Sequence, residues 1–330
     1  MSPLPSLKTL LIRFKHKNLN QILRFFFTRT PGLTILGDVY YYFKYRTRYY
    51  HHINRAAYRL YKANQDDLSP YTKDVVSAIK IDGVYAGAIK NISSHLNILD
   101  ELTKDAARLL KPVLNKPTEQ KRLSPTKLTA IGRDVQGAYL PNSFAAFFLS
   151  DDMLNIVNAC HGMLSRLNYV DIWHNIPATD DFVNYTERWH RDHEDLKMIK
   201  VFVYLSNVDE TTGPFTYLKG SQYGGRFGHI NPVKPPVGVS IDEQQFVELI
   251  SHDPTSLTVF TGEPGTIIIS DATGIHKGGR TISEPRTVVV ASYTSDAGVD
   301  PHSYRLPESI NPNTLSFAAK YAMRLESDYR

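Results

Sequence analysis

The chain has 330 residues, of which 42% are hydrophobic and 22% charged, a composition typical of a folded protein and not of a disordered one. Its formal net charge is +5, and its single cysteine, Cys160, excludes an internal disulfide and any metal site built from several cysteines. An unpaired thiol suits a reducing compartment, and we expect Cys160 to be a small buried residue on a helix.

The positive charge is concentrated at the start of the chain. Residues 1–64 contain twelve Lys and Arg residues against one acidic residue, Asp38, whereas the remainder contains 26 against 32. Apolar and aromatic residues recur near helical spacing on both sides of a break at residues 30–32. The sequence therefore predicts a basic, aromatic, helical extension joined to a mildly acidic body.

Three interpretations of this basic extension are open. It packs on the body or on a second subunit, or it contacts anionic lipid as a peripheral element, or it binds nucleic acid. No recognisable nucleic-acid motif accompanies it, so we expect no nucleic-acid partner. Basic residues interrupt every apolar run before the roughly 20 residues that a membrane-spanning helix needs, and a signal peptide is not evident. We therefore expect a cytoplasmic protein.

The body begins with helices and continues with strands. Residues 69–89 predict a capped helix that ends in a glycine turn and a strand, and residues 94–114 and 150–164 predict two further helices. Short β-branched or aromatic runs follow, bounded by Gly, Pro, Asn and Asp; they are 167–176, 182–190, 198–208, 213–220, 256–262, 265–273 and 286–295. This order predicts an α+β protein built on a β-sandwich or jelly-roll barrel.

The stretch "WHRDHEDL" carries the densest chemistry. His190 and Asp192 are separated by one residue, so on an extended strand end both side chains leave the same face and can reach one metal ion. Two histidines and one carboxylate form the facial triad of non-haem Fe(II) oxygenases. His276, at the end of a later strand, fits as the third ligand. Arg286 opens the next strand, where its guanidinium can hold a dicarboxylate; Arg280 is a rival for that role.

These motifs resemble a known family. "WHRD", "KVFVYLSNVDETTGPFTYLKGSQ", "IHKGG" and "EPR", in this order, are similar to the phytanoyl-CoA dioxygenase family of Fe(II)- and 2-oxoglutarate-dependent oxygenases. The resemblance covers residues 70 to 297. It implies a double-stranded β-helix flanked by helices, Fe(II) bound by His190, Asp192 and His276, and Arg286 as the anchor of the distal carboxylate of 2-oxoglutarate. We divide the chain into the extension (1–66), the oxygenase domain (67–300) and a C-terminal tail with a short helix (301–330).

The sequence does not determine which residues besides Arg286 contact 2-oxoglutarate. Some family members carry a serine two residues after the distal histidine, where this chain has Gly278. Alternation along "MIKVFVYL" places Lys200, Phe202 and Tyr204 on one face of a strand, and we expect this face to point into the barrel. Lys200 and Phe202 are therefore further candidates for binding 2-oxoglutarate, and Lys200 could instead meet an acidic substrate.

Other polar residues receive a structural interpretation. His193 faces away from its neighbouring ligands on an extended strand, so we expect it outside the metal site. Glu194 and Asp195 are expected to be solvated or to lie in a lid over the site. Residues 228–256 look like an insertion that shapes the pocket.

The resemblance implies an enzyme that uses Fe(II), 2-oxoglutarate and O2 to hydroxylate a C–H bond of a small organic substrate, releasing succinate and CO2. The alternatives are a metal-free or zinc-occupied protein of the same fold that serves as a binding scaffold, or a zinc hydrolase with Glu194 as the general base. Substrate identity stays open at the level of sequence.

Overall fold

The computed structural model describes most of the body and the end of the basic extension. The described residues are 39, 42–43, 46–65, 67–115, 127–129, 138–177, 183–231, 239–251, 253–298 and 304–325. The expectation of a helix in the first half of the extension, and part of the expected insertion at 228–256, lie outside the described residues.

Helices dominate the N-terminal part of the body. The described α-helices are α4 (Thr47–Ile53), α5 (Arg55–Asn64), α6 (Pro70–Ile81), α7 (Ile98–Leu114), α9 (Asn142–Phe148), α10 (Asp151–His161), α11 (Glu243–Ser251) and α12 (Phe317–Ala322). The three helices predicted from capping and periodicity correspond to α6, α7 and α10. Helices α9 and α11, each of at most nine residues, were not predicted from the sequence.

Helix α6 shows how local chemistry sets an element boundary. The Ser69 side chain accepts a hydrogen bond from the backbone N–H of Thr72, and Pro70 occupies the first turn, where its missing N–H is harmless. The chain leaves the helix through Gly83, whose φ of +81° favours glycine. A Cβ at Gly83 would also lie 2.4 Å from the Tyr217 hydroxyl. Glycine is therefore required here on both counts.

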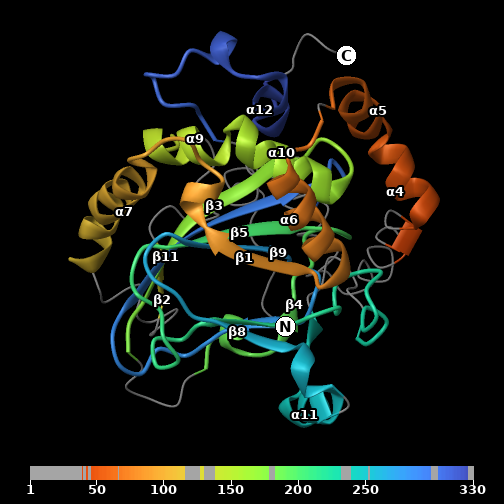
Figure 1. The fold of residues 1–330 in the computed structure, drawn as a ribbon, viewed down its shortest axis with the longest axis vertical. Helices are drawn as coiled ribbons and strands as arrows, with labels where there is room; N and C mark the ends of the chain where they lie inside the picture. Colours follow the sequence, from red (N-terminus) through yellow and green to blue (C-terminus); the bar gives the residue numbers. More distant parts are fainter. Residues whose placement is uncertain are drawn as a thin grey trace, which may run out of the picture.

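Two antiparallel sheets form the barrel. One has the strand order β1-β9-β5-β11-β3-β2 and the other β7-β4-β10-β6-β8. The strands are β1 (Val84–Ala88), β2 (Lys127–Thr129), β3 (Arg166–Asn175), β4 (His190–Arg191), β5 (Ile199–Tyr204), β6 (Phe215–Leu218), β7 (Val239–Ser240), β8 (Leu257–Phe260), β9 (Thr266–Asp271), β10 (His276–Gly278) and β11 (Arg286–Thr294). Figure 1 shows the six-stranded sheet with helices α6, α9 and α10 over its outer face and α11 at the far end of the molecule.

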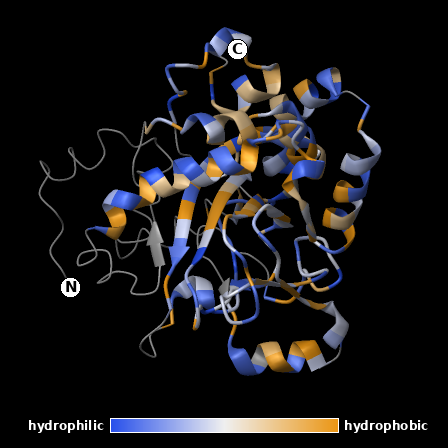
Figure 2. Ribbon diagram, turned by 60° about the vertical axis from the view of Figure 1, so that its left-hand side comes forward, coloured by the Kyte–Doolittle hydropathy of each residue, from blue (hydrophilic) through white to orange (hydrophobic). Residues whose placement is uncertain are grey.

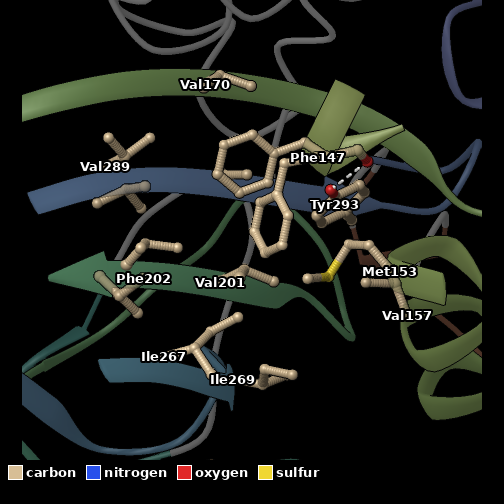
Figure 3. Packing of buried hydrophobic residues seen from close by; sticks show 14 of the residues in the cluster. Phe147, Met153, Val157, Val170, Val201, Phe202, Ile267, Ile269, Val289 and Tyr293 are labelled. Atoms are coloured by element: carbon tan, nitrogen blue, oxygen red, sulfur yellow. Dashed lines mark hydrogen bonds between the residues drawn. The ribbon is translucent and has the colours of Figure 1, made fainter. Parts of the chain in front are cut away.

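The main core lies between the six-stranded sheet and these helices. On the helix-facing side of β5, Val201 and Val203 are fully buried, and Ile267 and Ile269 of β9 continue the same layer. Phe147, Met153 and Val157 of α9 and α10 belong to the same cluster, as Figure 3 shows. The Tyr293 hydroxyl donates to the Phe148 carbonyl at 2.7 Å, so the buried phenol is satisfied at the sheet–helix boundary. This packing leaves the opposite face of the sheet to line the barrel interior.

The helices are amphipathic, with hydrophobic and hydrophilic residues interleaved along each of them (Figure 2). None of the helices that the structure describes is both long enough and apolar enough to cross a bilayer. Their apolar sides are used to cover the barrel.

The end of the basic extension packs on the body. Tyr50 of α4 and Ala57 of α5 are buried in a small apolar cluster with Met163, Leu164 and Tyr321. Five basic residues in and next to these two helices are exposed; they are Arg46, Arg48, Arg55, Arg59 and Lys62. Among the interpretations left open by the sequence, packing on the body holds for this segment.

The predicted strand at residues 182–190 is wrong. Tyr185–Glu187 form a 3-10 turn, because the Asn184 side chain accepts from the backbone at Glu187 and the Glu187 side chain accepts from the Asn184 backbone N–H. This reciprocal cap competes successfully with β pairing. Only His190 and Arg191 join a sheet, as strand β4.

Candidate active site

Two histidines from neighbouring strands lie directly opposite each other. Strand β4 pairs with β10 so that His190 is the register partner of His276, and their ring centroids are 4.3 Å apart. Asp192 follows β4, and its backbone N–H donates to the Ala272 carbonyl at 3.0 Å. The potential ligand atoms of the three residues all lie within 4.8 Å of one another, and all three residues are buried. The spacing predicted from the sequence therefore brings them to one point.

Backbone carbonyls orient both imidazoles. Nδ1 of His190 donates to the Arg188 carbonyl at 2.7 Å, and Nδ1 of His276 donates to the Gly274 carbonyl at 2.9 Å. These bonds leave the Nε2 lone pairs directed at the Asp192 carboxylate, at 3.8 Å from His190 and 3.5 Å from His276. Carbonyl acceptors of this kind hold metal-binding histidines in the correct tautomer and orientation.

Charge and burial keep all three side chains in the state that binds metal. Burial lowers the pKa of His190, and it lowers that of His276 to about 3 with help from the neighbouring imidazole. Burial alone would raise the pKa of Asp192, but the Lys200 ammonium and the two imidazoles hold it well below its usual range. At neutral pH the cluster thus has two neutral imidazoles and one carboxylate, a donor set that suits a divalent metal ion.

A cavity of about 400 Å³ opens onto this cluster. The triad comes from the five-stranded sheet and the loop after β4, and the facing wall comes from the six-stranded sheet. Its lining residues are Asp171, Trp173, Asn175, Tyr185, Thr186, Glu187, His190, Asp192, His193, Glu194, Lys200, Phe202, Tyr204, Phe215, His276, Gly278, Gly279, Arg286 and Val288. The face of β5 that alternation assigned to the barrel interior does line this cavity.

Arg286 is the first residue of β11 and lies opposite Asn175, the last residue of β3. Its side chain is 5% exposed, and Nη2 donates to the Asn175 side-chain oxygen at 3.1 Å. Nε has no hydrogen-bond partner among the described residues. Burial lowers the pKa of the guanidinium, and the Tyr204 and Glu187 charges oppose this shift. A buried donor left unpaired in a cavity wall is costly unless a ligand accepts from it.

Lys200 and Phe202 occupy the wall between Arg286 and the triad. The Lys200 ammonium forms an ion pair with the Asp192 carboxylate and lies 5.7 Å from the Tyr169 ring and 5.9 Å from the Trp173 ring. Phe202 packs against Phe215, with ring centroids 4.7 Å apart. Arg280, the rival anchor, is not among the residues that line the cavity.

Of the two alternatives expected for Glu194 and Asp195, solvation or a place in a lid over the site, solvation is wrong. Both side chains are buried. Asp195 accepts hydrogen bonds from the backbone N–H groups of Leu196 and Ser295, at 2.7 and 2.6 Å, which connects the loop after β4 to the end of β11. Glu194 accepts from the His193 N–H and lines the cavity, as does His193 itself. A polar run in the sequence thus lies inside the protein because backbone donors accompany it.

Arg191 was not singled out from the sequence, although it stands between two triad residues. Its side chain is 1% exposed. The guanidinium donates to four backbone carbonyls: those of Ser221, Thr273, Phe227 and Ile230. Because Thr273 adjoins Gly274, whose carbonyl orients His276, one side chain connects both segments that carry the candidate metal ligands. Asp171, Trp173 and Asn175 were also missed, although alternation along β3 places them on one face.

Helix α11 contacts the residue before strand β4 through an aromatic stack. The rings of Trp189 and Phe246 are nearly parallel, with centroids 3.7 Å apart. Lys277, which belongs to strand β10, places its Nζ 4.5 Å from the Trp189 ring centroid. The backbone N–H of Ile241 also donates to the Trp189 carbonyl. The insertion that contains α11 is therefore attached to the residue that precedes His190.

Comparisons with known proteins agree with this architecture. No family model and no curated protein matches the chain in sequence. EctD from S. alaskensis with bound Fe is 16% identical, with a TM-score of 0.51 over 79% of this chain and 85% of that chain. SnoN, a non-heme alpha ketoglutarate dependent epimerase from nogalamycin biosynthesis, is 13% identical with a TM-score of 0.45, covering 68% and 81%. HygX from Streptomyces hygroscopicus with nickel and 2-oxoglutarate bound is 14% identical, with a TM-score of 0.45, covering 69% and 87%.

The likeness to EctD establishes the fold. The α+β double-stranded β-helix flanked by helices, implied by the family resemblance in the sequence, is confirmed. The chemistry has to be argued from the side chains in the cavity.

Proposed function

We propose that this chain is an Fe(II)- and 2-oxoglutarate-dependent oxygenase that hydroxylates a C–H bond of a small organic molecule. The observation that carries the proposal is the buried cluster of His190, Asp192 and His276 in one cavity with Arg286. Two imidazoles and one carboxylate leave three positions of an octahedral ion open, enough for a chelating co-substrate and O2.

Each side chain has a defined task in this proposal. The triad holds Fe(II), and the Arg188 and Gly274 carbonyls keep the imidazoles aimed at it. When bound, the metal with 2-oxoglutarate and O2 supplies the oxidising power that places one oxygen atom in the substrate and yields succinate and CO2. The protein contributes geometry and a cavity that excludes bulk water.

In this proposal the guanidinium of Arg286 binds the distal carboxylate of 2-oxoglutarate. Nε lacks a partner among the described residues, whereas Asn175 holds Nη2 and so fixes the plane of the fork. A carboxylate would complete the buried donor set through a two-bond ion pair. Phe202 offers an apolar surface for the methylene groups, and Lys200 offers a positive charge beside the metal-binding carboxylate.

The test is reconstitution of the full chain with Fe(II) and 2-oxoglutarate without oxygen, followed by exposure to air in the presence of a mixture of small metabolites. We expect oxygen-dependent succinate and a product heavier by one oxygen atom. A zinc hydrolase with Glu194 as base would instead cleave substrate without consuming oxygen, and a binding scaffold would form neither product. Either result would refute the oxygenase proposal.

The exposed basic residues of α4 and α5 support a second, independent role. Five Lys and Arg side chains are exposed there, while Tyr50 and Ala57 of the two helices pack on the body. We infer that the extension contacts an anionic surface, such as the headgroups of acidic lipids, without taking part in the chemistry.

A further inference from the structure

Gly278 is a glycine that the packing of the protein does not require. It belongs to strand β10 and lines the cavity. Its φ is not among the positive values that favour glycine. Among the described residues, the atoms nearest to a Cβ built there would be the Thr186 carbonyl oxygen at 3.6 Å and Arg286 Nη2 at 3.7 Å, both at ordinary van der Waals distance. An alanine would therefore fit the ligand-free protein at this position.

The neighbouring glycine, Gly279, has a clear packing reason. A Cβ there would lie 2.7 Å from the backbone of Gly213, closer than a real Cβ comes to another atom. The Gly279 N–H also donates to the Pro214 carbonyl at 2.8 Å, so the two chain segments are in direct contact. Glycine weakens a strand, and within a strand it often marks a place that another backbone or a ligand approaches closely. A backbone explains Gly279, and a ligand is left to explain Gly278.

Gly278 lies between the candidate metal ligands and Arg286. It follows His276 by two residues on β10, so both positions face the same side of the strand, the side that lines the cavity. Beyond Gly278 lies Arg286, whose Nη2 would be 3.7 Å from the added Cβ. A 2-oxo diacid that chelates the metal at one end and binds Arg286 at the other therefore has to pass Gly278.

Both ends of this path are held in place. Backbone carbonyls orient the two imidazoles, and Asn175 holds Nη2 of Arg286 at 3.1 Å. Phe215, the register partner of Gly278 on β6, packs against Phe202 with ring centroids 4.7 Å apart, and both rings line the cavity. Because the two ends are fixed, a longer diacid has to bend sideways. The space that a side chain would fill at Gly278 gives it room for one more carbon.

We infer that Gly278 sets the length of the 2-oxo diacid that the site accepts, and that the cavity takes 2-oxoadipate, which is one methylene longer, nearly as well as 2-oxoglutarate. This inference rests on the proposed function, because it assigns the metal to the triad and the distal carboxylate to Arg286. Gly278 is thus a specificity-determining position. Its bare backbone lets a longer chain bend, and a side chain there would exclude the extra methylene.

The test measures the binding of two co-substrates without turnover. The full chain is loaded with Zn(II), and 2-oxoglutarate or 2-oxoadipate is titrated by calorimetry into the wild type and into Gly278→Ala. In the wild type we expect the two dissociation constants to lie within about tenfold of each other. In Gly278→Ala we expect the preference for 2-oxoglutarate to increase by at least about tenfold, because one methylene loses its space.

Thermal melts of the ligand-free protein test why the glycine is there. Gly278→Ala should melt no lower than the wild type, because its Cβ makes only ordinary contacts. Gly279→Ala is the matched control and should melt lower, because its Cβ would overlap the backbone of Gly213.

Three results would each overturn the inference and leave the oxygenase proposal standing. The wild type binds 2-oxoadipate more than about tenfold more weakly than 2-oxoglutarate, or the preference in Gly278→Ala increases by less than about tenfold, or Gly278→Ala melts as low as Gly279→Ala. If 2-oxoglutarate itself does not bind to the Zn(II)-loaded wild type, the oxygenase proposal fails and the inference falls with it.

Discussion

The Arg191 guanidinium donates to the Thr273 carbonyl at 2.6 Å and thereby connects the strand that carries His190 to the segment that leads into His276. Replacing Arg191 with Met leaves four backbone carbonyls without this donor, two of them fully buried. We expect the free energy of unfolding to fall by about 2–4 kcal/mol, as measured by urea denaturation of the metal-free protein. Arg188→Met, at an exposed neighbouring position, should be nearly silent; equal stabilities of the two variants would show that the network does not hold the strands together.

The triad itself predicts a specific pattern of metal binding. His190→Ala, Asp192→Ala and His276→Ala should each weaken Fe(II) binding by at least about 100-fold, because each removes a ligand and not merely an outer contact. Metal titration by calorimetry measures this. His193→Ala is the control, since His193 lines the cavity but lies outside the cluster. Normal iron affinity in any of the three ligand variants would remove that residue from the site.

Asp192 has a second task that separates it from the two histidines. Without metal, its carboxylate pairs with the buried Lys200 ammonium. We expect Asp192→Ala to destabilise the metal-free protein by about 3 kcal/mol, because breaking a buried pair strands the remaining charge. Adding Lys200→Met to Asp192→Ala should restore most of this loss in thermal melts. If the double variant melts no higher than the single one, the ion pair is not the source of the effect.

The co-substrate anchor is tested through 2-oxoglutarate affinity. Arg286→Lys should weaken binding at least tenfold, because an ammonium cannot reproduce the planar two-bond contact of a guanidinium. Isothermal titration in the presence of Zn(II) measures this without turnover. Arg280→Lys is the matched control at a position outside the cavity lining. A loss of affinity in Arg280→Lys and none in Arg286→Lys would exchange the two assignments.

Stability should fall in mild acid, in part through His161. Burial lowers the pKa of His161 to about 3, and its ring contacts Ser165 Oγ and the Lys197 carbonyl. Between pH 6.5 and about 3 the unfolded chain therefore binds more protons at this residue than the folded chain does. Stability rises with pH through this window and is lost as pH falls, by about 1.4 kcal/mol per pH unit for one group. Urea denaturation from pH 7 to 4.5 should show a shallower slope in His161→Gln, and an identical slope would contradict the assignment.

Truncation separates the basic extension from the chemistry. Deleting residues 1–64 uncovers Met163, Leu164 and Tyr321, so we expect a lower melting temperature with metal and 2-oxoglutarate binding retained. Sedimentation with vesicles containing phosphatidylserine should detect binding of the full chain at low salt and release at high salt, because exposed charges are screened over roughly 8–10 Å. Loss of metal binding on truncation would make the extension part of the catalytic fold.

The grouping of His190, Asp192 and His276 could be predicted from the sequence because its geometry is largely local. One intervening residue places His190 and Asp192 on one side of the chain, and a strand end followed by glycines marks His276. Helices α6 and α10 could also be predicted from the sequence, because Ser69 and Ser150 cap them and apolar residues recur at helical spacing. The barrel fold was harder to predict than the cluster or the helices, and its prediction depended on the family resemblance.

The errors have a shared physical origin. Asp195 was expected to be solvated or in a lid, but it is buried and accepts from the backbone N–H of Ser295, which lies 100 residues away in the sequence. The 3-10 turn at Tyr185–Glu187 replaced a predicted strand through a reciprocal cap that pattern alone did not reveal. Arg191 was overlooked because its four acceptors are backbone carbonyls. Every residue has a backbone carbonyl, so the amino-acid sequence does not indicate which ones accept from Arg191. In each case backbone hydrogen bonding decided the outcome.

The chain contains only two tryptophans, and they occupy different parts of the site. Trp173 lies in the cavity wall, whereas Trp189 is stacked on Phe246 beneath helix α11. Their fluorescence can therefore be separated by single substitution. In Trp189→Phe the emission comes from Trp173 and reports what fills the cavity, and in Trp173→Phe it comes from Trp189 and reports the seating of α11 on the residue before His190. The protein thus carries two intrinsic fluorescent reporters: Trp173 reports whether the cavity is occupied, and Trp189 reports whether helix α11 is packed on the residue before His190.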